Sequence, residues 1–148
     1  MKELAAALRA EVARAAAHLG RLGEREAMEP RGPDKWVRKE ILGHLIDSAA
    51  NNHQRFVRAQ LADRYAGPGY DQEAWVRAQR YRERPWAELV ELWVALNRHL
   101  AAIVEVVPEG KLQTPCVVGG DAPHTLEWVM TDYLRHLKHH LEQIGAAA

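Results

Sequence analysis

The sequence predicts an all-α fold, a four-helix bundle, and three observations lead to that prediction. Four segments repeat their apolar side chains at a spacing of three and four residues, which is the pattern of amphipathic helices. Glycine and proline gather between these segments, and no alternating strand pattern of useful length appears. The chain has 148 residues, 47% of them hydrophobic, so residues 1–148 are predicted to form a single domain.

The four helices follow from their apolar stripes and their end signals. The first covers residues 2–22 and the second residues 36–63. Pro85 suits the first position of a third helix, and Thr125 is a suitable N-cap for a fourth helix that extends to Gly145. The stripes of the four helices contain Leu4, Leu8, Val12, Ala15, Leu19 and Leu22; Ile41, Leu42, Leu45, Ala49 and Phe56; Leu89, Leu92, Trp93, Leu96, Leu100, Ile103 and Val107; and Leu126, Val129, Met130, Tyr133, Leu137, Leu141 and Ile144.

The lengths of the connections limit how the helices can be ordered. A short link permits only antiparallel neighbours, whereas the stretch from Arg64 to Arg84 is long enough to return along a whole helix. The second and third helices are therefore either parallel and joined by a crossover, or antiparallel in a simple up-and-down bundle.

Charge and cysteine content exclude several classes of protein. Twenty Lys and Arg balance twenty Asp and Glu, which argues against a nucleic acid or an anionic membrane as partner. The N-terminal residues mix charged with apolar side chains, unlike a signal peptide or a membrane span. Cys116 is the single cysteine and has no partner for an internal disulfide. We therefore expect a cytoplasmic protein that acts on a small molecule.

Helical geometry separates the histidines that face the core from those that face water. In the fourth helix, His140 lies within the apolar face, His136 lies on its margin and His139 lies on the wetter side. The spacing of four residues places the imidazoles of His136 and His140 one above the other, as two ligands of one ion require. In the second helix, His44 lies on the margin of the apolar face.

A polar ridge accompanies His44 along the second helix. It contains Asp47, Asn51 and Glu40, whose carboxylate and amide groups could orient a ligand ring or help to transfer a proton. Buried histidines are also often satisfied by neighbouring carboxylates, so a hydrogen-bond network is the alternative to an ion. Either arrangement would relieve the cost, about 1–3 kcal/mol, of a half-buried imidazole without a partner.

Three motifs in this order make the chain resemble a known family. They are Trp36 followed by Glu40-Ile-Leu-Gly-His44-Leu-Ile-Asp47-Ser48, Asn51 and Arg55-Phe56; then Gly69-Tyr70-Asp71-Gln-Glu-Ala-Trp75; and finally His136-Leu-Lys-His-His140 with Gln143-Ile144. From Trp36 to Ile144 the chain resembles DinB-like proteins, and especially their YfiT-like branch.

The resemblance implies an up-down-down-up four-helix bundle with a long crossover between the second and third helices. It implies one divalent metal ion held by three histidines, which correspond to His44, His136 and His140. Proteins of this kind are described as metal-dependent hydrolases, and some as transferases that join a low-molecular-weight thiol such as bacillithiol or mycothiol to an electrophile. A homodimer is a further expectation from the resemblance.

One position departs from the family pattern. Val37 stands after the tryptophan where the family often has Ser or Thr, so the second helix loses a cap of about 1 kcal/mol unless Asp34 replaces it.

Three neutral imidazoles would leave a coordination position open on a divalent ion such as zinc or nickel, and imidazole ligands alone do not identify the metal. Water or a thiol could bind there, so both hydrolysis and thiol transfer are open to such a site. We expect Asp47 to orient a ligand or to transfer a proton. The alternatives are a helical scaffold with a structural metal and a stress-related protein that binds a ligand without turning it over.

Overall fold

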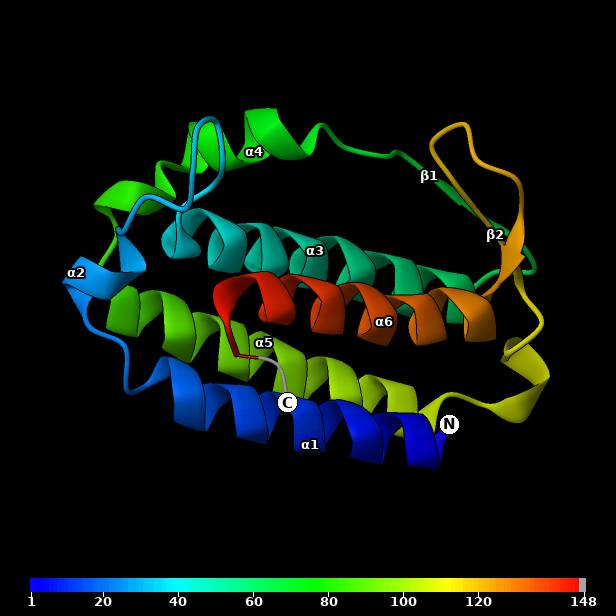
Figure 1. The fold of residues 1–148 in the computed structure, drawn as a ribbon. Helices are drawn as coiled ribbons and strands as arrows, with labels where there is room; N and C mark the ends of the chain where they lie inside the picture. The colour runs from blue at the N-terminus through cyan, green and yellow to red at the C-terminus, as the bar shows by residue number, and fades with distance from the viewer. Residues whose placement is uncertain (147–148) are drawn as a thin grey trace.

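The computed structural model describes residues 1–146 and shows a bundle of four long helices with short elements between them (Figure 1). In chain order the elements are α1 (Lys2–Leu19), α2 (Glu24–Ala27), α3 (Arg38–Gln60), β1 (Tyr65–Gly67), α4 (Gln72–Gln79), η1 (Tyr81–Glu83), α5 (Trp86–Val106), η2 (Glu109–Lys111), β2 (Pro115–Val118), β3 (His124–Thr125) and α6 (Leu126–Ile144).

The bundle has the up-down-down-up order. In Figure 1, α1 and α6 run in one direction, and α3 and α5 run in the other. Around the bundle, α1 packs on α5, α5 on α3, α3 on α6, and α6 on α1. The parallel neighbours α3 and α5 are joined by the crossover, residues 61–85, so the simple up-and-down alternative is excluded.

The crossover lies along α3, and a small sheet fixes its N-terminal end. The strands have the order β1-β2-β3, with β1 parallel to β2 through Tyr65 and Cys116, and β2 antiparallel to β3 through Cys116 and His124. The sequence pattern did not predict this sheet, because strands of three, four and two residues are too short to show alternation. The sheet connects the crossover to the β2–β3 hairpin, residues 115–125.

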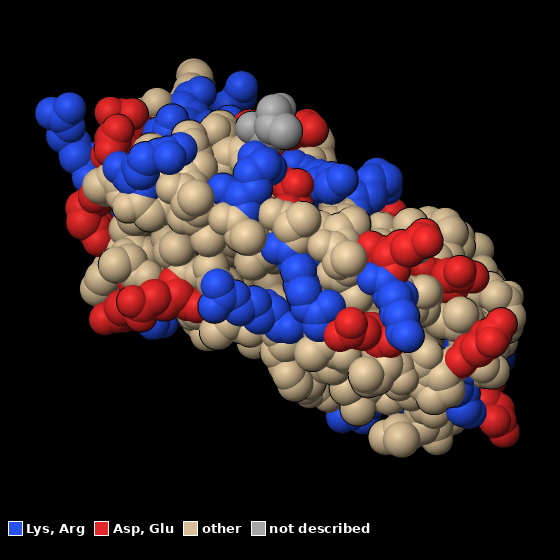
Figure 2. Space-filling view, turned by 90° about the horizontal axis from the view of Figure 1, so that it is seen from below, with Lys and Arg blue, Asp and Glu red and all other residues tan. Residues whose placement is uncertain are grey.

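The core lies between the four long helices. Its largest fully buried side chains all belong to the predicted stripes: Trp93, Phe56, Leu8, Leu19, Ile41, Leu42, Leu45, Leu89, Leu100, Leu126, Met130 and Leu137. On the face seen from below, Lys and Arg side chains are interspersed with Asp and Glu (Figure 2). None of the helices described is a candidate membrane span, since none is both long and apolar enough.

The helix ends show how the sequence sets the bounds. Thr125 caps α6 as predicted, because its Oγ1 accepts a hydrogen bond from the Trp128 N–H at 3.1 Å. Asp34 does not replace the missing cap, because Val37 is the N-cap of α3 and, among the residues described, no side chain makes a capping hydrogen bond to the first turn. Glu40 partly compensates instead, because its Oε2 accepts from the Val37 N–H at 2.9 Å. Helix α1 ends three residues earlier than predicted. Helix α3 begins two residues later and ends three residues earlier than predicted.

A buried lysine fastens the crossover and α2 to α3. Lys39 is only 4% exposed, and its Nζ donates hydrogen bonds to the carbonyl oxygens of Arg84 at 2.7 Å and Arg82 at 3.3 Å. The same ammonium group pairs with the Glu24 carboxylate of α2 at 2.5 Å. Lys39 therefore fixes the segment that covers the N-terminal half of α3.

Candidate metal centre

Three imidazole rings from two helices meet between α3 and α6. The His44 Nε2 lies 3.2 Å from the His136 Nε2, and the His140 Nε2 lies 3.1 Å from the same atom. One nitrogen from each ring lies within 4.8 Å of the other two. The structure thus brings together the three histidines selected from the sequence, although His44 is completely buried rather than on the margin.

Burial keeps these rings neutral. Together with the neighbouring histidines, it lowers the pKa of His44 to about 3 and that of His136 to about 4. Burial also lowers the pKa of His140, while its hydrogen bond to Gln143 opposes that change. At neutral pH the three rings therefore offer lone pairs, which is the form that binds a metal ion.

The spacing of the ring nitrogens fits a single divalent ion. Two imidazole nitrogens that each lie about 2.0–2.1 Å from one ion are separated by about 2.8–3.4 Å, for angles at the ion from a right angle to a tetrahedral angle. The two observed separations, 3.2 Å and 3.1 Å, fall in that range. A neutral imidazole has only one N–H, so a cation satisfies three converging nitrogens better than shared protons do.

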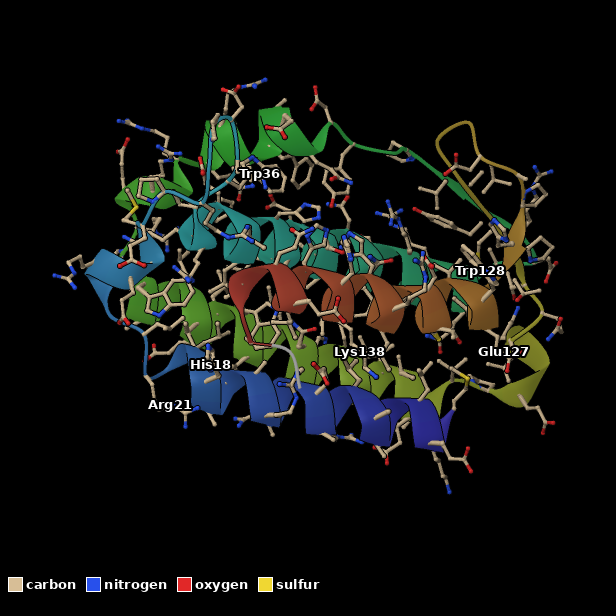
Figure 3. The ribbon with its side chains drawn as sticks, in the orientation of Figure 1. His18, Arg21, Trp36, Glu127, Trp128 and Lys138 are labelled. Carbon is tan, nitrogen blue, oxygen red and sulfur yellow. The ribbon has the colours of Figure 1, made fainter. Side chains whose placement is uncertain are left out.

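Neighbouring side chains hold the rings in place. The Gln143 Oε1 contacts the His140 Nδ1 at 3.1 Å, and its Nε2 contacts the His139 Nε2 at 3.0 Å. The Trp36 ring lies against His44 with a centroid separation of 5.3 Å, between the start of α3 and α4 (Figure 3). Among residues 1–146, the His44 Nδ1 has no hydrogen-bond partner.

Asp47 lies one turn after His44 and belongs to a buried polar cluster. Its Oδ1 accepts hydrogen bonds from the Tyr81 hydroxyl at 2.6 Å and from the Gln79 Nε2 at 2.5 Å. Its Oδ2 is buried without a partner in the part of the chain described. Burial raises the pKa of Asp47, and the two hydrogen bonds partly oppose this. Asp47 therefore has one oxygen that is held and one that is free to accept a proton.

Gly43 makes this cluster sterically feasible. A Cβ atom at Gly43 would lie 2.1 Å from the Cδ2 of Tyr81, so only glycine lets that ring lie against α3. Sequence reasoning missed Tyr81 and Gln79, which come from the crossover. A glycine directly before a candidate ligand, within a helical pattern, was the signal that something approaches the backbone there.

The other members of the polar ridge have partners away from the rings. The Arg82 guanidinium donates to the Glu40 carboxylate at 2.8 Å, which accounts for Glu40 together with its bond to Val37. The Asn51 side-chain nitrogen donates to the Asp47 carbonyl oxygen at 2.9 Å within α3. The contacts of both residues are those of structural side chains.

A cavity of about 340 Å³ adjoins the candidate metal centre at His136. It lies between α3 and α6, under the crossover and the β2–β3 hairpin, and His136 forms part of its wall. Trp128 lies near its hairpin side, where α6 begins (Figure 3). Cys116 also lines the cavity, but burial raises the pKa of its thiol, which favours the protonated form.

Comparisons with known proteins agree with this architecture. A family model described as the DinB superfamily matches residues 7–144. No curated protein sequence matches the chain. The solved structure of YfiT from Bacillus subtilis, described as a probable metal-dependent hydrolase with an unusual four-helix bundle topology, is similar with a TM-score of 0.84 at 19% identity, over 97% of this chain and 82% of that one.

A second solved structure has the same fold within a longer chain. It is the mycothiol-dependent maleylpyruvate isomerase, which is similar with a TM-score of 0.80 at 13% identity. The match covers 99% of this chain but 61% of the isomerase, so this chain corresponds to only part of that protein.

Proposed function

The chain belongs to the DinB superfamily, and from that premise we propose that it is a metalloenzyme acting on a small molecule. In this proposal His44, His136 and His140 hold one divalent ion, and the enzyme activates a thiol or a water molecule beside it. The observation that carries the proposal is the convergence of three neutral imidazole nitrogens next to a cavity.

The ion would supply Lewis acidity, which lowers the pKa of a bound thiol or water and makes it a nucleophile near neutral pH. The chain supplies the remaining functions. Gln143 orients the ring of His140, and the Trp36 ring fills the space against His44. The free Oδ2 of Asp47 accepts the proton that the nucleophile loses, while Tyr81 and Gln79 hold the other carboxylate oxygen.

We favour S-transfer from a low-molecular-weight thiol over hydrolysis. In that reaction a bond forms between the thiol sulfur and an electrophilic carbon, and the leaving group departs with its electron pair. Two features support this choice: the Gly69–Trp75 segment, which resembles the YfiT-like crossover, and the fold shared with a mycothiol-dependent isomerase.

Metal analysis of protein purified without a His tag tests the metal site directly. The proposal predicts about one divalent ion per chain in the wild type. The His44→Ala variant is expected to lose most of that metal, whereas His53→Ala, on the same helix, is expected to keep it. A wild type that binds no metal, even after addition of zinc or nickel, would overturn the proposal.

A thiol panel with monochlorobimane then tests S-transfer. The enzyme is expected to accelerate formation of the bimane conjugate, with release of chloride, and a chelator is expected to abolish the acceleration. Metal binding together with absent or chelator-insensitive conjugation would instead favour hydrolysis, a structural metal or a ligand-binding protein. The homodimer and the cytoplasmic location stay predictions from the sequence, and light scattering would test the homodimer.

A further inference from the structure

The cavity beside the candidate metal centre is elongated along α3 and α6. Its lining includes Ser48 and Arg55 of α3, which are seven residues apart and therefore separated by about 10 Å along the helix. On α6 the lining runs from His136 back to Trp128, a rise of about 12 Å. One end of the cavity thus reaches His136, one of the three histidines, and the other end reaches Arg55.

Arg55 is a half-buried cation without a carboxylate partner among residues 1–146. Its one side-chain hydrogen bond within this part of the chain is with the Asn52 Oδ1, which accepts from Nη1 at 3.4 Å. By contrast, Arg38 of α3 pairs with Glu29 at 3.4 Å, and Arg82 of η1 pairs with Glu40 at 2.8 Å. A guanidinium that faces a cavity without an ion pair is suited to bind an anionic ligand.

The acidic residues of the cavity do not neutralise Arg55. Asp132 pairs with Arg135 of its own helix at 2.5 Å, and Asp121 is exposed on the hairpin. Tyr70 also lines the cavity. Burial and the charge of Asp47 raise the pKa of its phenol to about 12, while Arg55 and a hydrogen bond with Ser48 oppose that increase. The hydroxyl of Tyr70 therefore stays protonated and can donate a hydrogen bond to an anion.

Beside the polar side chains of Ser48, Asn52 and Gln72, an apolar strip lines the wall between the two ends. It contains Val118, Val129 and the ring of Trp128, which stacks on His124 with a centroid separation of 3.7 Å. Such a wall suits the hydrocarbon part of a ligand rather than a second charged group.

We propose that Arg55 binds a carboxylate group of the substrate, at the end of the cavity away from the histidines. This inference rests on the proposed function and defines its substrate class. The substrate is an elongated acid with its reactive group at the histidines, an apolar body along Val129 and Trp128, and a carboxylate at Arg55. His44 and Arg55 are eleven residues apart, about 16 Å along α3, and the long arginine side chain spans part of that distance.

The test uses the cobalt-loaded protein, because a thiol bound to cobalt(II) gives a charge-transfer absorption band. The probes are 8-mercaptooctanoic acid, the matched neutral 8-mercapto-1-octanol and the short 3-mercaptopropionic acid. In the wild type, the long acid is expected to bind about tenfold or more tightly than the long alcohol. In R55Q this preference is expected to disappear, and the affinity for the short acid is expected to remain unchanged.

The control is R58Q, which removes the same charge from an exposed position of α3. It is expected to keep the preference of the wild type. A preference for the long acid that survives in R55Q, or that R58Q removes equally, would overturn the inference. Circular dichroism and cobalt content show that each variant is folded and loaded.

A metal-free measurement separates failure of this inference from failure of the proposed function. If no thiol gives the cobalt band, the metal does not bind thiols and the thiol-transfer proposal fails. Calorimetric titration of the metal-free wild type and R55Q with octanoate and with 1-octanol then still decides the role of Arg55. Binding of octanoate that depends on Arg55 supports the inference, and equal binding to both proteins contradicts it.

Discussion

His140 and Gln143 are linked across one turn of α6, with the His140 Nδ1 3.1 Å from the Gln143 Oε1. The amide nitrogen of Gln143 faces His139, so its oxygen is the atom that faces His140. An oxygen there accepts a hydrogen bond from Nδ1–H, so the Nε2 of His140 carries the lone pair directed at the other rings. The tautomer of one candidate ligand is thus set by a residue that does not touch the ion.

Gln143→Ala is predicted to weaken metal binding by about 10- to 100-fold, because the His140 ring loses the acceptor that orients it. Competition titration with a chromophoric chelator measures this change. Gln143→Glu retains an acceptor oxygen and is expected to restore most of the affinity. Gln113→Ala, an exposed glutamine in the η2–β2 connection, serves as the matched control. Wild-type affinity in Gln143→Ala would show that the hydrogen bond has no role in metal binding.

The metal-free protein is predicted to become less stable as the pH falls from about 6.5 to about 4. Burial lowers the pKa of His44 to about 3 and that of His136 to about 4, from an ordinary value of 6.5. In that range the unfolded chain binds protons that the folded chain does not bind, so protons favour unfolding. Each such histidine contributes about 1.4 kcal/mol per pH unit to the slope.

Urea denaturation of chelator-treated protein across this pH range measures the slope. His136→Asn is expected to reduce it by the contribution of one histidine. His99→Asn removes an exposed histidine and is expected to leave the slope unchanged. A free energy of unfolding that does not vary between pH 6.5 and 4 would contradict the neutral, buried state of the rings.

Lys39→Met is predicted to lower the free energy of unfolding by about 1–3 kcal/mol, because two carbonyl oxygens of the crossover lose their donor. The loss should also loosen η1, which carries Tyr81, so hydrogen exchange is expected to rise in residues 80–85. Lys138→Met, an exposed change on α6, provides the comparison. Equal stability of the two variants would mean that the buried ammonium does not hold the crossover.

Gly43→Ala is predicted to destabilise the protein by about 1–3 kcal/mol through overpacking against the Tyr81 ring. Helix propensity alone predicts the opposite effect, because alanine is more favourable than glycine in a helix by about 1 kcal/mol. A loss of stability would therefore report the contact with Tyr81. Gly110→Ala is the matched control, since no atom lies within 4 Å of a Cβ added at Gly110. Thermal denaturation of the two variants measures the effect, and a more stable Gly43→Ala would show that Tyr81 moves aside freely.

Helical periodicity accounts for what the sequence could predict. Within one helix, the direction of a side chain follows from its position, so the shared face of His136 and His140 could be derived before any tertiary contact was known. The meeting of these two with His44 needed the resemblance as well, because periodicity alone does not state which helices are neighbours. The length of the connection between α3 and α5 allowed both a parallel and an antiparallel arrangement, so the resemblance was needed to predict the parallel one.

Irregular segments account for what the sequence could not predict. Tyr81 and Gln79 reach Asp47 from 34 and 32 residues away, and no periodic pattern relates them. The complete burial of His44 has the same origin, since the crossover covers a ridge that the helix alone would leave half exposed. Arg55 was part of a recognised motif, but its lack of a carboxylate partner becomes visible only when the neighbouring elements are in place.

The small sheet and the helices hold different parts of the site. Its parallel pairing of β1 with β2 ties together the two irregular segments that roof the cavity, while the candidate ligands project from α3 and α6. Insertions or replacements at the exposed hairpin tip, residues 119–123, can therefore remodel what enters the cavity without displacing a ring nitrogen. Evolution can vary selectivity and reactivity in such a molecule independently, and a protein engineer can do the same.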